Sequence, residues 1–168
     1  MFRAKKVFIT LMVFSSICIL AGEATAAWQV GVAPATRKIL PVTPMPEETS
    51  ITLQSCRNEW EAFQVVIRSG SAISNINVTL SDLSGPDSEL LPASKARLYR
   101  EYYLNVTDES PGSVTYHERG TGLYPDPLIP FTDPYAEETM PVGAPFDINA
   151  AEDEGLATVF IDWYVPED

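Results

Sequence analysis

The most regular feature of the chain is an alternation between apolar and more polar positions. Within residues 58–70, an apolar face of Phe63, Val65 and Ile67 alternates with a mixed face that includes Gln64 and Arg68. A period of two is typical of a β-strand with one buried and one solvated face. Residues 156–168 repeat the pattern, so both segments are predicted to be core strands. Their apolar faces are Phe63, Val65 and Ile67 in the first segment, and Val159, Ile161, Trp163 and Val165 in the second.

Other segments show shorter or less perfect alternation, and no long segment has the 3.6-residue period of a helix. Residues 96–107 place Leu98, Tyr102, Leu104 and Val106 on one side, interrupted by Arg100. Many short β-branched and aromatic runs between turn residues predict an all-β fold, namely an antiparallel β-sandwich of immunoglobulin-like or jelly-roll-like type. The further predicted strands are residues 28–34, 49–55, 76–83 and 145–150.

Residues 108–143 contain six prolines and no periodic run, which predicts a long proline-rich loop. Its central part, "RGTGLYPDPLIPF" at residues 119–131, is either a binding loop or a rigid brace. The brace is favoured, because proline fixes φ and lowers the entropy lost on ordering. Arg100 needs a partner on its otherwise apolar face. Asp126 is a candidate for that partner, so Arg100 is expected to pin the loop onto the sheet; a ligand contact is the alternative.

The amino terminus has the three parts of a secretory signal. A basic start is followed by an apolar run, and Ala24-Thr25-Ala26 provides the small-x-small cleavage site. The run is shorter than the ~20 apolar residues of a membrane span, although a retained amino-terminal anchor is the alternative. We therefore expect residues 1–26 to be a signal peptide, residues 27–168 to be one exported β-sandwich domain, and no membrane association after cleavage.

The chain ends shortly after its last strong strand. A sheet that ended there would expose an unpaired edge with a fully apolar face. The domain is therefore expected to be incomplete at its carboxy terminus.

The charge balance narrows the classes of partner. The formal net charge is −12, and loss of three basic residues with the signal would make it more negative. Nucleic acid and anionic membrane surfaces are disfavoured, because they bind basic surfaces. Neutral sugars, cations and basic partners remain open.

Few motifs carry chemistry, and no cofactor is predicted. The sequence has no phosphate-binding glycine loop and no Cys/His set with metal-ligand spacing. Residues 150–155, "AAEDEG", are a calcium candidate, with a solvated turn as the alternative. Glu59 and Glu61 are spaced as an acid–base pair, but they flank the start of a strand, and a role at the end of the preceding turn is expected. Cys56 is expected to be a small buried residue with an inert thiol.

Four stretches in this order carry a family resemblance: "NEWEAFQVVIRS", "LYREYYLNV", "GLYPDPLIPF" and "ATVFIDWYVPED". Together they resemble the amino-terminal β-sandwich domain of exported bacterial proteins related to glycoside hydrolase family 123. The resemblance implies that a catalytic barrel acting on N-acetylhexosaminides follows the sandwich. It also implies that the catalytic Asp-Glu pair lies in that barrel, so no catalytic residue carries over to this chain.

Three functions remain open at this stage. The chain is expected to be a non-catalytic accessory domain that packs on the missing catalytic domain of a glycoside hydrolase, with Arg100, Tyr124 and Asp126 as inter-domain loop candidates. A free-standing carbohydrate-binding or surface adhesion module is the alternative. It would stack a glycan on exposed rings, with Tyr99 and Tyr103 as candidates beside Tyr124. An immunoglobulin-like spacer without a ligand is the third.

Overall fold

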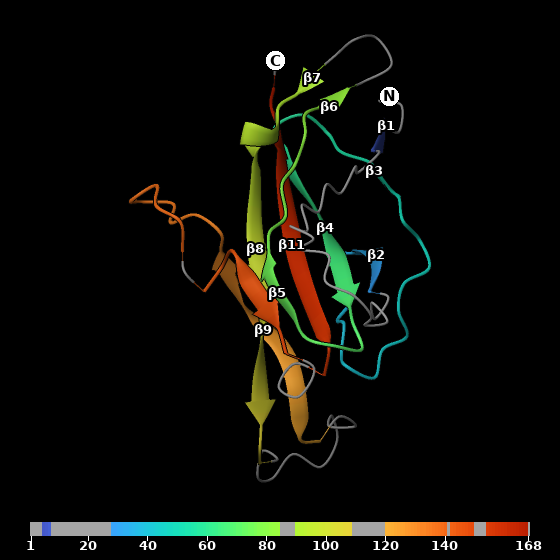
Figure 1. Ribbon diagram of the computed structural model, residues 1–168. Helices are drawn as coiled ribbons and strands as arrows, with labels where there is room; N and C mark the ends of the chain where they lie inside the picture. The colour runs from blue at the N-terminus through green and yellow to red at the C-terminus, as the bar shows by residue number, and fades with distance from the viewer. Residues whose placement is uncertain are drawn as a thin grey trace, which may run out of the picture.

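The computed structural model describes residues 28–84, 90–108, 120–140, 142–149 and 154–167, together with the backbone of residues 5–7 (Figure 1). These residues form strands and one short 3₁₀ helix, η1 (Ala93–Lys95). The predicted all-β, antiparallel class is confirmed. No helix in this part of the chain is long and apolar enough to cross a membrane. The strands are β1 (Lys5–Val7), β2 (Gln29–Pro34), β3 (Ile51–Leu53), β4 (Glu59–Arg68), β5 (Ile73–Ile76), β6 (Leu83–Ser84), β7 (Leu90–Leu91), β8 (Ala96–Val106), β9 (Gly122–Pro130), β10 (Phe146–Ile148) and β11 (Leu156–Val165).

The main sheet has five strands in the order β2-β4-β11-β8-β9, and all neighbours are antiparallel. β11 lies at its centre and pairs with β4 on one side and β8 on the other (Figure 1). The expectation that the last strand leaves an exposed edge is therefore wrong. The described residues also form three two-stranded sheets, which pair β1 with β3, β5 with β10, and β6 with β7.

The core fills the inner face of the five-stranded sheet. Phe63, Val65, Val159, Ile161 and Trp163 are at most 1% exposed, as the alternation predicted. Residues of the β5–β10 sheet and its flanking segments, together with Phe131 at the end of β9, pack on them in one cluster: Ile76, Val78, Phe131, Ala144, Phe146 and Ile148. One full sheet covered by a smaller second layer is consistent with a β-sandwich.

The outer face of the sheet differs from the expectation of a solvated surface. Residues 35–46 cross part of this face and bury Val66 and Leu156 against Ile39 and Met45. We call residues 35–46 the cover segment. Gln64, expected to face water, is 1% exposed. The outer face is thus divided into a covered half and an open half.

Side chains of the sheet hold the cover segment by hydrogen bonds to its main chain. The Arg68 guanidinium donates to the carbonyl oxygens of Pro41 and Thr43 at 2.8 and 3.1 Å. The Tyr103 hydroxyl donates to the Ile39 carbonyl oxygen at 2.8 Å. Buried carbonyl groups need such donors because they have lost water. Polar residues that looked solvated in the sequence are therefore structural.

β9 corrects the prediction of one long loop. Residues 122–130, part of the supposed loop, pair with β8 along its length. Proline lacks an N–H donor but is tolerated on edge strands, whose outer side has no ladder to complete, and β9 is an edge of the sheet. The register shifts between Glu101 and Tyr103, so a bulge in β9 falls near Asp126.

The predicted strand at residues 76–83 is also displaced. β5 is Ile73–Ile76, while residues 77–82 lie outside any strand. Burial nevertheless alternates along them, since Val78 is buried and its neighbours Asn77 and Thr79 are exposed. The alternation correctly marked which side chains face the core, but not which backbone groups pair.

Several predictions fall on residues outside the described part. The predicted signal peptide, residues 1–26, lies outside it apart from the backbone of residues 5–7, which pairs with β3. The calcium candidate at residues 150–155 also lies outside it, apart from Glu154 and Gly155. Among the described residues, no group of three or more His, Cys, Asp or Glu is placed to hold a metal ion.

Candidate functional site

The open half of the outer face carries aromatic side chains from three strands. The β4–β11 register sets Trp60 opposite Tyr164. Four residues away along β11, Phe160 lies opposite Gln64 on β4 and Tyr99 on β8. Asp162 lies between these two rows, opposite Arg97 on β8. We call this set the aromatic face: Trp60, Arg97, Tyr99, Phe160, Asp162 and Tyr164.

Trp60 is the centre of the aromatic face. Its ring centroid lies 5.2 Å from that of Tyr164, with the planes tilted by 45°. The Arg97 guanidinium carbon lies 4.5 Å from the Trp60 ring centroid, a cation–π contact. Trp60 remains 41% exposed. A large apolar ring that is held on two sides and still open to solvent suits contact with another surface.

The neighbours of Trp60 are fixed as well. The Tyr164 hydroxyl donates to the Asn58 side-chain oxygen at 2.6 Å. Tyr99 and Phe160 pack edge-to-face at 6.5 Å between centroids and 68° between planes. Burial raises the pKa of Asp162, while the nearby Arg97 charge acts in the opposite direction. The aromatic face therefore combines ordered rings, one cation and one partly buried carboxyl group.

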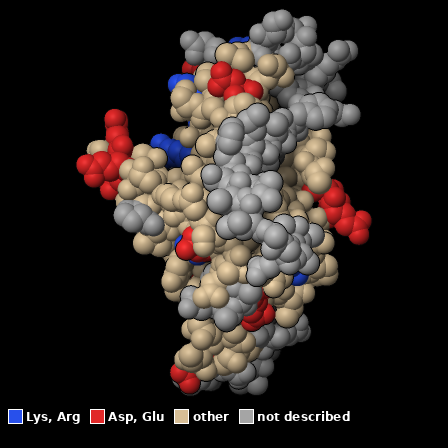
Figure 2. Space-filling model, in the orientation of Figure 1, with Lys and Arg blue, Asp and Glu red and all other residues tan. Residues whose placement is uncertain are grey.

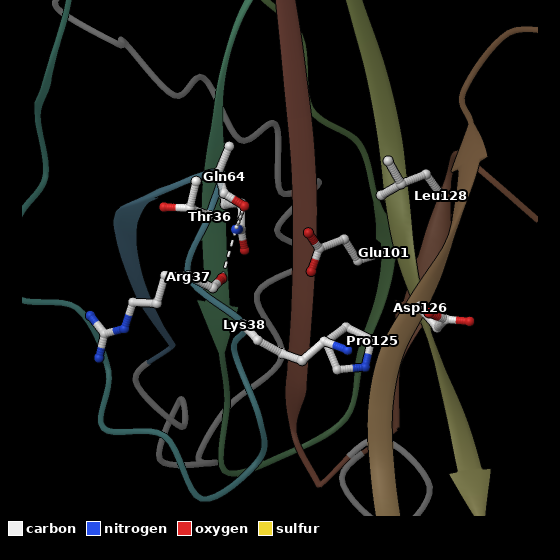
Figure 3. A pocket seen from close by; sticks show the side chains of 9 residues that line it. Thr36, Arg37, Lys38, Gln64, Glu101, Pro125, Asp126 and Leu128 are labelled. Carbon is white, nitrogen blue, oxygen red and sulfur yellow. Dashed lines mark hydrogen bonds between the residues drawn. The ribbon is translucent and has the colours of Figure 1, made fainter. Parts of the chain in front are cut away.

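A pocket lies between the start of the cover segment and strands β4, β8 and β9. Figure 3 shows it above β11, with Gln64 and Glu101 on facing sides. Its cavity volume is about 160 Å³. We call it the Glu101 pocket. Its lining residues are Ala35, Thr36, Arg37, Lys38, Gln64, Glu101, Pro125, Asp126 and Leu128.

Glu101 is the most unusual group in the pocket. It is 8% exposed, and no residue in the described ranges gives it a hydrogen bond or an ion pair. Burial raises the pKa of its carboxyl group to about 7, and the charge of Lys38 only partly opposes that shift. Glu101 therefore changes charge near neutral pH, a property common at functional sites.

Gln64 fixes the wall of the pocket. Its side-chain nitrogen lies within 3.0 Å of the carbonyl oxygens of Pro34, Ala35 and Arg37, which anchors the start of the cover segment. Its side-chain oxygen is buried and has no partner among the described residues. One wall of the pocket is thus a backbone turn that the hydrogen bonds of Gln64 keep in place.

The structure separates the residues predicted to brace the supposed loop. Arg100 donates a long hydrogen bond of 3.4 Å to the Val142 carbonyl oxygen, and its guanidinium carbon lies 4.9 Å from the Phe146 ring centroid on the core side. Asp126 lines the Glu101 pocket on the outer side instead. Adjacent residues on a strand point to opposite faces, so Arg100 lies on the core face while its neighbour Glu101 lies on the outer face with Asp126. The expected contact between Arg100 and Asp126 is therefore wrong.

The three tyrosines proposed to stack a glycan do not form one platform. Tyr99 belongs to the aromatic face, but the Tyr103 hydroxyl is bonded beneath the cover segment, 3.0 Å from the Thr158 hydroxyl. The Tyr124 hydroxyl donates to the Gly120 carbonyl oxygen at 2.9 Å. Sequence reasoning did not select Trp60, Arg97 and Tyr164. All three lie on the less apolar face of a strongly predicted strand. Aromatic and charged residues on that face were the sequence signal that could have identified them.

Comparison with known proteins adds no family to this description. No family model matches the chain, and no curated protein matches it. Figure 2 shows that acidic side chains are scattered in separate small groups over the face drawn, with few basic ones. The acidic composition therefore does not gather into one patch on that face.

Proposed function

We propose that this chain is the non-catalytic β-sandwich module of an exported glycoside hydrolase, and that its aromatic face packs against the catalytic domain of the same protein. The glycoside hydrolase assignment rests on the sequence resemblance. The packing role rests on the arrangement of Trp60, Tyr164 and Arg97 on an otherwise open sheet face.

The composition of the aromatic face supports a protein partner. Trp, Tyr and Arg are enriched among the residues that carry most of the binding energy at protein interfaces. Because the rings are already ordered by mutual contacts, little conformational entropy would be lost on packing. The partner surface should be apolar where it meets Trp60 and should present an acceptor to Arg97.

Footprinting of the full-length protein tests this proposal. Trp28 and Trp60 are 42% and 41% exposed in this chain, so Trp28 is a matched internal control. Hydroxyl-radical oxidation read by mass spectrometry should modify Trp60 several-fold more slowly than Trp28 in the full-length protein. Equal oxidation of the two tryptophans would sink the packing role. A gene that encodes no catalytic domain after this module would sink the whole proposal.

Glycan binding remains the second candidate, because half-exposed rings on one sheet face can also stack on sugars. A sugar ring stacks on an uncovered and flat aromatic surface. Trp60 and Tyr164 are tilted by 45° and the Arg97 guanidinium lies over the Trp60 ring, so this arrangement favours glycan binding less than protein packing. Calorimetric titration with N-acetylhexosamine oligosaccharides distinguishes the two. Saturable binding that Trp60→Ala abolishes would favour the glycan-binding module.

A further inference from the structure

The Glu101 pocket contains a carboxyl group that lacks a partner. The Glu101 side chain is more than nine-tenths buried and lines the cavity beneath the cover segment. Within the described residues, no donor reaches it. Burying a carboxylate without a donor is costly, and most proteins satisfy such a group with a cation or with several N–H groups. An unsatisfied acceptor inside a preformed cavity therefore indicates a ligand that donates.

The other walls narrow the chemistry of that ligand. The Asp126 carboxylate also lines the pocket but points away from Glu101 in Figure 3, and the side-chain oxygen of Gln64 is fully buried in the wall. Pro125 and Leu128 add apolar surface. A group with three N–H donors and no acceptor matches the Glu101 carboxylate, and a short methylene stem matches the apolar wall. We propose that the Glu101 pocket binds a primary alkylammonium group.

Lys38 is the internal competitor for Glu101. Its charge acts on the Glu101 carboxyl group, yet no ion pair joins the two residues in the described structure. In Figure 3 the Arg37 guanidinium points away from Glu101. Lys38 therefore stands at the pocket as an ammonium group of the chain itself, and a ligand ammonium must compete with its charge. This site does not depend on the packing of the aromatic face.

Binding should depend on pH through Glu101. Among the charged residues that line the pocket, Lys38 acts on the Glu101 carboxyl group, whereas the side chains of Arg37 and Asp126 point away from it in Figure 3. β11 and β4 contribute the uncharged Thr158 and Gln64. The ammonium binds the ionised carboxylate. Well below the carboxyl pKa of about 7, affinity should therefore rise by roughly tenfold per pH unit. Above that pKa it should level off.

The test is a titration of this chain with butylammonium, followed by two-dimensional NMR at pH 8. We expect saturable shifts at pocket residues. Glu101→Gln should weaken binding at least about tenfold, whereas Lys38→Met should strengthen it several-fold. Glu138→Gln, which removes an exposed carboxylate on another turn, should have no effect. Tetramethylammonium, with the same charge but no N–H donor, and butanol, with the same stem but no charge, should both fail to bind.

Three outcomes would overturn the ammonium site. The first is no binding by either the wild type or Lys38→Met. The second is equal loss in Glu101→Gln and Glu138→Gln, and the third is equal binding of tetramethylammonium. The source of the ammonium is distinguished by comparing butylammonium with an acetylated, amidated Ala-Lys-Ala peptide. Tighter binding of the peptide identifies a lysine side chain of a partner protein. Tighter binding of butylammonium identifies a free amine.

Discussion

The Tyr103 hydroxyl donates a hydrogen bond of 2.8 Å to the carbonyl oxygen of Ile39. This bond joins the middle of β8 to the middle of the cover segment, 64 residues apart in the sequence. It therefore ties the wall of the Glu101 pocket to the sheet. Removing the bond tests whether the cover segment is an integral part of the fold.

Tyr103→Phe should lower the free energy of unfolding by about 1–3 kcal/mol, because it removes the hydrogen bonds of the Tyr103 hydroxyl with the Ile39 carbonyl oxygen and with the Thr158 hydroxyl. Urea denaturation monitored by circular dichroism measures this change. Tyr102→Phe is the matched control, because Tyr102 is the neighbouring tyrosine and is 38% exposed. Equal effects of the two substitutions would contradict the clamping role of Tyr103.

Gly31→Ala should destabilise the fold by about 1–3 kcal/mol, because a Cβ at this position would overlap the backbone carbonyl of Pro46. Gly70→Ala is the control, since a Cβ there meets nothing within 4 Å. Thermal melts of the two variants should differ by several degrees. Closely similar melting temperatures would mean that the cover segment does not pass so near β2.

The stability of the chain should fall as pH rises from about 4.5 to about 7. The folded state holds the Glu101 proton more tightly, because burial raises the carboxyl pKa from 4.5 to about 7. This contribution is complete below the lower value and is lost as pH rises through the upper one. In Glu101→Gln this part of the pH dependence should disappear. Parallel melting curves for wild type and variant across that range would argue against a buried acid.

The chain by itself should hydrolyse no glycoside. Burial, with a smaller effect of the neighbouring Glu59, raises the pKa of Glu61. Glycosidase carboxyl groups flank a bound sugar, whereas Glu59 and Glu61 are next neighbours on one face of the same strand. Purified chain should therefore show no turnover of a chromogenic N-acetylhexosaminide. Turnover that Glu59→Gln abolishes would refute this prediction.

Cys56 should react slowly with iodoacetamide at pH 7 although it is exposed. The expectation that it is buried was wrong, because it lies in the exposed segment before β4. A hydrogen bond with Glu59 and the charge of Glu59 raise the pKa of the thiol, which lowers the fraction of reactive thiolate. Glu59→Gln should speed alkylation several-fold. An unchanged rate would show that Glu59 does not control the thiol.

Sequence reasoning predicted the inner side of the sheet well, because Phe63, Val65 and Ile161 follow a simple alternation. It failed on the outer side, where Gln64 and Arg68 appear solvated but donate to main-chain carbonyl groups of residues 34–43. β9 was missed because its prolines resemble a loop, and only its place at the sheet edge makes them acceptable.

The candidate site depended on information that no local pattern contains. Trp60 and Tyr164 become neighbours only through the β4–β11 register. Glu101 meets Lys38 only because the cover segment returns over the sheet. Tyr99 was selected from the sequence as a ring that could stack on a glycan. Its packing partner Phe160 was not selected.

The central position of β11 also sets the order in which the protein can fold. β2 pairs with β4, and β8 pairs with β9, so these two pairs can form from segments synthesised early. The two pairs do not hydrogen-bond to each other directly, because β11 lies between them in the sheet. β11 is also synthesised after both pairs. Long-range pairing of this kind slows folding. The two halves should therefore join into one sheet only after β11 has been synthesised.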